Sequence, residues 1–128
     1  MKTKSSKIII TGFPNAGKSS LVNLLLKKKI SIVSSKVQTT KDNIQAVLNY
    51  RNCQMVFIDT PGIINKTKYY SKQLSREIFK NIEQVDINLF VFDSTKNLTL
   101  LKKKKIKEII STFKKNYLIL SKIDLIKN

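Results

Sequence analysis

The amino-acid sequence predicts an α/β fold with a mostly parallel, doubly wound sheet, on three observations. Short apolar runs alternate with segments of helical periodicity, an order that places helices on both faces of a parallel sheet. The run Ile87–Phe92 is apolar at every position except Asn88, as expected in the middle of such a sheet. The 128 residues, 41% of them hydrophobic, are enough for one domain with its own core and too few for two.

The individual elements follow from the same patterns. In the first helix, Leu21, Leu24 and Leu25 share one face. The second and third strands are joined only by Arg51–Cys53, which is too short for a crossover, so they form an antiparallel pair at the edge of the sheet. The predicted strands are Lys7–Thr11, Asn43–Tyr50, Gln54–Asp59, Ile87–Phe92 and Tyr117–Leu120, and the predicted helices are Lys18–Lys28, Ser71–Gln84 and Thr99–Lys114.

Four small or polar residues directly follow an apolar strand. Right-handed crossovers bring the carboxyl ends of parallel strands to one edge of the sheet, where α/β proteins bind ligands. We therefore expect Gly12, Asp59, Asp93 and Ser121 to lie close together at that edge.

The segment Gly12–Ser19 fits the phosphate-loop pattern G-x-x-x-x-G-K-S between a predicted strand and helix. Its amides form an anion cradle, to which the helix N-terminus adds its positive dipole end. Lys18 is a candidate catalytic residue that contacts the β- and γ-phosphates, and the Ser19 hydroxyl is a Mg²⁺ ligand. The predicted purine nucleotide site comprises Gly12, Phe13, Pro14, Asn15, Ala16, Gly17, Lys18, Ser19 and Ser20.

A second motif, D-T-P-G, follows the third strand. The Asp59 carboxylate is expected to hold Mg²⁺ through water, and the Gly62 amide to sense the γ-phosphate as a second candidate catalytic group. A hydroxyl of Thr39 or Thr40 could complete the Mg²⁺ shell, although an ordinary polar loop is the better explanation of these threonines taken alone. The motif adds Asp59, Thr60, Pro61 and Gly62 to the predicted site.

The last predicted strand leads into Ser121-Lys122-Ile123-Asp124, which is similar to the guanine-specificity motif N-K-x-D. The Asp124 carboxylate would accept from the N1–H and N2–H of guanine, donors that adenine lacks, while the Lys122 stem packs on the base. Ser121 stands where the motif has asparagine. The shorter serine loses the amide that ties the base to the phosphate loop, so we expect guanine selectivity with weaker affinity.

The net charge of +17 has two interpretations of about equal weight. It fits a polyanionic partner, either RNA or an anionic membrane surface. It also fits the codon bias of an AT-rich genome, because nearly all basic residues are lysine. Cys53 is the only cysteine, which fits a reducing cytoplasm.

Taken in order, these motifs resemble the Era-like ribosome-assembly GTPases. The resemblance rests on Gly12–Asn23 and on Ile30–Lys41, which contains the family's K-x-Q-T-T-[RK] loop, and it covers nearly the whole chain. It implies a P-loop NTPase fold, GTP and GDP as ligands, Mg²⁺ and slow GTP hydrolysis. It makes Thr40 the Mg²⁺-sensing threonine and a candidate catalytic residue.

The resemblance also implies partners and further roles. It implies GTP-dependent binding to small-subunit ribosomal RNA and the 30S subunit, in a cytoplasmic protein with peripheral contact at the inner membrane. Ile63 stands where Ras-type proteins place a water-orienting glutamine, so its side chain cannot orient the attacking water. Asn15 stands where relatives are thought to coordinate K⁺.

One departure concerns the C-terminal end. Era-like proteins continue through a last strand, a last helix and an RNA-binding KH domain, whereas this chain stops at Asn128, soon after Asp124. We therefore expect residues 1–128 to form a partial G domain with an uncovered apolar sheet face. Such a domain is an engineered fragment, a split gene product whose remainder lies on another chain, or a decaying reading frame. Three functions stay open: a GTPase, a nucleotide-binding fragment with little hydrolysis, and a basic RNA-associating fragment.

Overall fold

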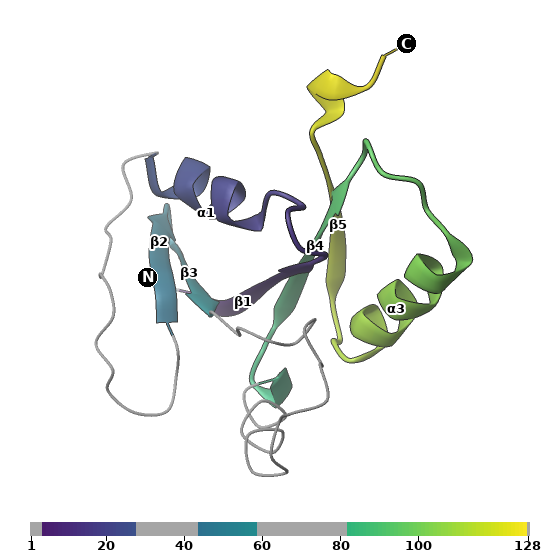
Figure 1. Ribbon diagram of the computed structural model, residues 1–128. Helices are drawn as coiled ribbons and strands as arrows, with labels where there is room; N and C mark the ends of the chain where they lie inside the picture. Colours follow the sequence, from purple (N-terminus) through teal and green to yellow (C-terminus); the bar gives the residue numbers. More distant parts are fainter. Residues whose placement is uncertain (1–3, 28–43, 59–81, 128) are drawn as a thin grey trace.

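The computed structural model describes residues 4–27, 44–58 and 82–127, and every structural statement below concerns these residues. They form a five-stranded sheet in the order β2-β3-β1-β4-β5 (Figure 1). The strands are β1 (Lys4–Gly12), β2 (Ile44–Tyr50), β3 (Cys53–Ile58), β4 (Ile87–Asp93) and β5 (Asn116–Ser121). The helices are α1 (Lys18–Lys27), α3 (Leu100–Ser111) and the short 3₁₀ helix η1 (Ile123–Leu125).

The pairing of the strands confirms the predicted sheet. β1 lies at the centre and runs parallel to β3 and β4, and β5 runs parallel to β4. β2 pairs with β3 in antiparallel fashion at one edge. The turn between them is tighter than predicted, because Cys53 already belongs to β3 and Arg51 adopts a left-handed φ of 51°.

Helices α1 and α3 cover opposite faces of the sheet, which makes it doubly wound (Figure 1). Leu25 of α1 packs against a cluster on one face, and Ile109 of α3 packs against a cluster on the other. Among the described residues, no helix is long and apolar enough to span a bilayer. The buried members of the α1 cluster are Ile8, Ala46, Leu48 and Phe57, and those of the α3 cluster are Ile9, Ile58, Ile82, Val85 and Phe113.

The predicted apolar face of α1 was wrong in one position. Leu24 is 57% exposed, whereas Val22 is buried and Leu25 is half-buried. At about 100° per residue, Leu24 lies some 200° around the helix from Val22 and points away from the sheet. The leucine positions alone therefore misplace the buried face of α1 by about one residue.

The helix predicted over Thr99–Lys114 is shorter in the structure. Thr99 is the N-cap of α3, and its hydroxyl accepts from the Lys102 amide at 3.3 Å. The helix ends at Ser111, so the buried Phe113 belongs to the connection that leads into β5. Of the helix predicted over Ser71–Gln84, residues 71–81 lie outside the described residues, and the two that follow are helical.

The otherwise apolar strand β4 contains a fully buried amide, that of Asn88. Thr11 Oγ1 donates to Asn88 Oδ1 at 2.7 Å, and Asn88 Nδ2 donates to Asn116 Oδ1 at 2.9 Å. Asn116 Nδ2 in turn donates to the carbonyls of Ile110 and Phe113, at 2.9 and 3.1 Å. This chain of bonds crosses three strands and reaches the end of α3, so the buried polar groups are satisfied.

The outer strand β5 exposes large apolar side chains, as the sequence predicted for one part of the sheet. Tyr117, Leu118 and Leu120 are 52%, 63% and 54% exposed. Because successive residues of a strand point to opposite faces, this exposed surface lies on both faces of β5 rather than on one.

Candidate nucleotide-binding site

The loop between β1 and α1 is shaped by residues with positive φ. Gly12 has a φ of 153°, and a Cβ there would lie 2.4 Å from the carbonyl oxygen of Val91 on β4. Only glycine therefore permits this approach of β1 to β4. Asn15 (φ 61°) and Gly17 (φ 98°) then turn the chain into α1, with the Ala16 amide bonded to the Phe13 carbonyl at 3.2 Å.

The first turn of α1 presents amide groups to the loop. The Leu21 amide donates to the Gly17 carbonyl at 3.0 Å and closes the turn. The amides of Lys18, Ser19 and Ser20 precede it and have no intrahelical acceptor in an α-helix. Together with the helix dipole, they favour an anion at this end of α1, as the phosphate-loop motif predicts.

The Lys18 ammonium is anchored inside this loop. Nζ donates to the carbonyl oxygens of Gly12 and Phe13, both at 2.8 Å. An ammonium has three protons, so one remains for a phosphate oxygen. Burial lowers the pKa of Lys18 from its ordinary value of 10.5.

The expected gathering of strand ends is confirmed for the residues that are described. Asp93 pairs with Ser121 across β4 and β5, and Gly12 pairs with Val91, two residues before Asp93. Asp59, the fourth predicted member, lies outside the described residues.

Ser121 ties the base-side loop to the phosphate loop, contrary to the prediction that the serine would lose this tie. Its Oγ lies 2.5 Å from the Ala16 carbonyl oxygen and 3.1 Å from that of Phe92. One hydroxyl donates one proton, and the shorter contact with Ala16 identifies its acceptor. The small side chain suffices because the two loops are close: a Cβ built on Gly17 would lie 3.7 Å from the Ser121 Cβ.

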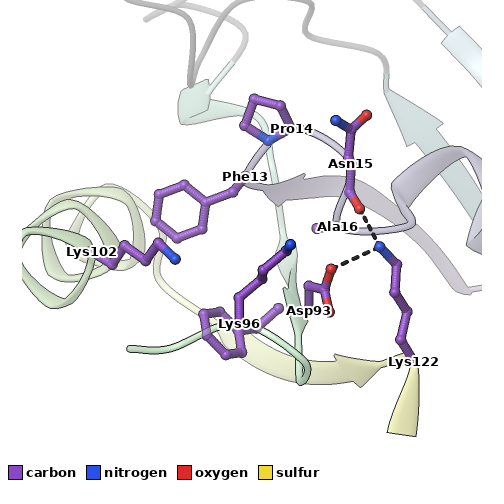
Figure 2. Close-up of a pocket in the computed structure, with 9 residues that line it drawn as sticks. Phe13, Pro14, Asn15, Ala16, Asp93, Lys96, Lys102 and Lys122 are labelled. Atoms are coloured by element: carbon purple, nitrogen blue, oxygen red, sulfur yellow. Dashed lines mark hydrogen bonds and ion pairs between the residues drawn. The ribbon is translucent and has the colours of Figure 1, made fainter. Parts of the chain in front are cut away.

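Lys122 makes a second connection between the same loops (Figure 2). Its Nζ donates to the Asn15 carbonyl at 2.8 Å and to Asp93 Oδ2 at 2.7 Å. Asp93 Oδ1 accepts from the Thr95 amide at 2.9 Å and from the Thr95 hydroxyl at 2.5 Å. The bonds from Lys122 and Thr95 hold the pKa of the Asp93 carboxyl far below its usual range.

The sequence placed Asp93 at the sheet edge but gave it no role. The pairing of β4 with β5 puts Asp93 directly beside Ser121 and next to Lys122. The available signal was a carboxylate placed directly after an apolar strand.

A pocket of 290 Å³ lies between the phosphate loop and α3. Figure 2 shows the ammonium groups of Lys96 and Lys102 directed into it, beside the pair formed by Asp93 and Lys122. Lys102 Nζ also donates to the Asn97 carbonyl at 3.0 Å. The lining is Phe13, Pro14, Asn15, Ala16, Phe92, Asp93, Lys96, Lys102 and Lys122, of which the sequence had not singled out Phe92, Lys96 and Lys102.

The described part of the metal site is one hydroxyl. Ser19 is exposed at the start of α1, and hydroxyl and carboxylate oxygens are the hard donors that Mg²⁺ takes. No cluster of three or more His, Cys, Asp or Glu residues that could hold a metal occurs within residues 4–27, 44–58 and 82–127. The predicted residues Thr40, Asp59, Thr60, Pro61, Gly62 and Ile63 lie outside these ranges.

At the base end, Asp124 lies in η1 and is exposed, as is its neighbour Ile123. A carboxylate exposed here is accessible to a ligand, as its predicted contact with guanine requires. The site thus brings the phosphate loop and the S-K-I-D segment together in one place.

Fold and site together define a P-loop protein of the GTPase class. The chain belongs to the family described as 50S ribosome-binding GTPase, whose model matches residues 7–122.

Within that family the resemblance to Era-like GTPases is confirmed. GTPase Era of Fusobacterium nucleatum is 37% identical over 128 residues, which cover 98% of this chain and 43% of the relative. GTPase Era of Clostridioides difficile is 41% identical over 124 residues, covering 94% of this chain and 41% of the relative. The chain thus spans less than half the length of these curated relatives.

Solved structures show the same similarity. A crystal structure of Era in complex with MgGDPNP and nucleotides 1506–1542 of 16S ribosomal RNA has a TM-score of 0.66 and 32% identity, covering 98% of this chain and 43% of that one. A structure of an Aquifex aeolicus Era variant bound to GDP·AlF₄⁻ has a TM-score of 0.63 and 32% identity, covering 94% of this chain and 42% of that one.

Proposed function

We propose that this chain binds GTP and GDP with Mg²⁺ and hydrolyses GTP as a molecular switch. The observation that carries the proposal is the double tie between the two halves of the site, through Ser121 to Ala16 and through Lys122 to Asn15. It joins the phosphate side and the base side of the site at two points. The similar Era structures, bound to MgGDPNP and to GDP·AlF₄⁻, support the same ligand class.

The proposed roles follow from the geometry and the motifs. The amides after Gly17 bind phosphate oxygens, and the remaining proton of Lys18 is donated to the β- and γ-phosphates. Mg²⁺, when bound, neutralises charge on those oxygens. Ser19, Thr40 and Asp59 would hold it, Gly62 would sense the γ-phosphate, and Asp124 would select guanine.

The central test is titration of the chain with GTP and with ATP, with and without Mg²⁺, followed by measurement of phosphate release. We expect Mg²⁺-dependent binding that favours GTP, and slow release of phosphate. Lys18→Ala should abolish binding, because it removes the anchored ammonium. Lys27→Ala, an exposed lysine at the far end of α1, is the matched control and should bind normally. Retained affinity in Lys18→Ala would refute the proposed site.

The alternative is a nucleotide-binding fragment that hydrolyses little GTP. It is favoured by the coverage, since the chain spans 43% of the F. nucleatum relative. Binding without phosphate release over many hours would support this alternative. Absence of any binding would leave only a basic RNA-associating fragment.

We further propose K⁺ as an activator through Asn15, whose backbone is held at the apex of the phosphate loop by Lys122. Turnover should be faster in KCl than in NaCl at equal ionic strength. Equal rates in the two salts would remove K⁺ from the mechanism.

The proposed partner is small-subunit ribosomal RNA, in a switch that acts during assembly of the 30S subunit. The similar Era structure holds nucleotides 1506–1542 of 16S ribosomal RNA, and the net charge of +17 suits a polyanion. Binding of that RNA segment should exceed binding of a scrambled RNA of the same length, and should weaken steeply as salt rises. Equal affinity for both RNAs would indicate a non-specific electrostatic contact. Preference for the large subunit would instead follow the family description.

We also propose a cytoplasmic location with peripheral contact at the inner membrane. Cell fractionation with a salt wash tests the location. A protein that stays wholly in the soluble fraction at low salt would argue against membrane contact.

A further inference from the structure

Asp93 is a buried carboxylate at the centre of the site that none of the predicted roles uses. Its side chain is only 8% exposed, and both of its oxygens accept hydrogen bonds. Burying a charged group is unfavourable unless it is paired and hydrogen-bonded. Here the pairing is complete: the Lys122 ammonium lies on one oxygen and two Thr95 donors lie on the other.

We propose that Asp93 is a positioning residue that sets the geometry of the nucleotide site by holding the Lys122 ammonium against the phosphate loop. The inference rests on the proposed function. The ammonium lies between two acceptors from different parts of the chain, Asp93 Oδ2 at 2.7 Å and the Asn15 carbonyl at 2.8 Å. It therefore connects the end of β4, the end of β5 and the phosphate loop at one point (Figure 2).

The backbone on both sides of this contact adopts a conformation that needs support. Lys122 has a φ of 55° and Asn15 a φ of 61°, in the left-handed region that non-glycine residues visit rarely. Such conformations persist when surrounding contacts hold them. The Lys122 ammonium is a contact that these two residues share, and Asp93 is its charged partner.

Loss of the carboxylate changes this contact in a defined way. In Asp93→Asn the ammonium exchanges a charge-assisted bond for one to a neutral group, which is about half as strong. The Lys122 stem, which packs on the base, and the Asn15 backbone then lose a common anchor. We expect faster dissociation of guanine nucleotide, whereas single-turnover hydrolysis of bound GTP changes much less, because Lys18 keeps its own anchors.

The experiment measures dissociation of a fluorescent GDP analogue from the intact chain. Asp93→Asn should dissociate about threefold to tenfold faster, the loss expected when a hydrogen bond to a charged group keeps about half of its strength. Asp86→Asn is the matched control: the same substitution on an exposed residue just before β4, at the opposite end of that strand, which should leave the rate unchanged. Thermal unfolding without nucleotide shows whether each variant is folded.

A double-mutant cycle separates positioning through Lys122 from a general structural role. If Asp93 acts through Lys122, then in a Lys122→Met background the Asp93→Asn change should add less than twofold. Additive effects of the two substitutions would overturn the inference.

Thr95→Val is a second variant for the case that Asp93→Asn does not fold. It keeps the charges of Asp93 and Lys122 and removes only the hydroxyl that donates to Asp93 Oδ1. It should accelerate dissociation roughly threefold to tenfold, because it removes one hydrogen bond to the Asp93 carboxylate while the Thr95 amide still holds the same oxygen. An unchanged rate in Thr95→Val would overturn the inference. If the wild-type chain binds GDP and folded Asp93→Asn releases it at the wild-type rate, the inference is also overturned, whereas the proposed function stays intact. Absence of GDP binding to the wild-type chain would overturn both.

Discussion

The hydroxyl of Ser121 offers a direct measure of how strongly the two loops of the site are coupled. Ser121→Ala removes the donor to the Ala16 carbonyl, an oxygen that the wild-type hydroxyl approaches to 2.5 Å. Ala16 is only 1% exposed, so the residue left behind is shielded from water. An unsatisfied buried acceptor costs about 1–3 kcal/mol.

That range sets the expected result for stability. The free energy of unfolding of the nucleotide-free chain, measured by urea denaturation, should fall by about 1–3 kcal/mol in Ser121→Ala. Ser121→Thr keeps a hydroxyl and should recover most of the loss. Ser111→Ala is the matched control, because the Ser111 hydroxyl donates to the Glu108 carbonyl at 2.8 Å on the exposed surface of α3. It should cost less than about 0.5 kcal/mol.

The same variant tests the functional claim. If the tie pre-organises the phosphate loop, the GDP affinity of Ser121→Ala should fall by about fivefold to a hundredfold, since 1.4 kcal/mol corresponds to tenfold. Stability and affinity equal to those of the wild type would refute the reasoning, because the contact would then have no energetic weight. A loss of stability with unchanged affinity would restrict Ser121 to a structural role.

Three further predictions concern the frame that carries the site. Gly12→Ala places a Cβ 2.4 Å from the Val91 carbonyl oxygen and should destabilise the fold by more than about 3 kcal/mol. Gly17→Ala, whose Cβ has its nearest neighbour at 3.7 Å, should cost only the backbone strain of about 1–3 kcal/mol. Equal losses in urea denaturation would contradict the close approach of Gly12 to Val91. Phe90→Ala, at a position 1% exposed, should lower the unfolding free energy by about 3–5 kcal/mol, and a loss below 1 kcal/mol would mean that the site collapses around the deletion. The folded-state pKa of Asp93 is depressed from its ordinary 3.8, so the stabilisation from this carboxylate is present above pH 3.8 and is lost as the pH falls through and below that value. The unfolding free energy should therefore fall more steeply with acid in the wild type than in Asp93→Asn. Parallel curves for the two proteins would contradict the ion pair.

The sequence by itself determined the class of fold and the position of the phosphate site. Alternating apolar and helical patterns predicted the parallel sheet, and the short link between the second and third strands predicted the antiparallel edge. The pattern from Gly12 to Ser19 located the anion-binding turn, because a phosphate loop is built from consecutive residues whose own backbone makes the site. Such local features are legible without knowledge of the tertiary structure.

Finer choices within the elements depended on packing. The buried side of α1 is set by where the sheet lies, so Val22 is inside and Leu24 outside although both are apolar. Asn88 is fully buried in an otherwise apolar strand because two partners on neighbouring strands satisfy its amide. Neither partner is close to Asn88 in the sequence.

The contacts that unite the site were decided only by the tertiary structure. Ser121 and Ala16 are 105 positions apart, Lys122 and Asn15 are 107 apart, and Lys122 and Asp93 are 29 apart. The motif predicted what Lys122 does to a base, but not that Asp93 holds it or that a serine reaches the phosphate loop. Those outcomes depend on gaps of a few ångströms between strand ends, which the register of β4 and β5 fixes and which residue types alone do not encode.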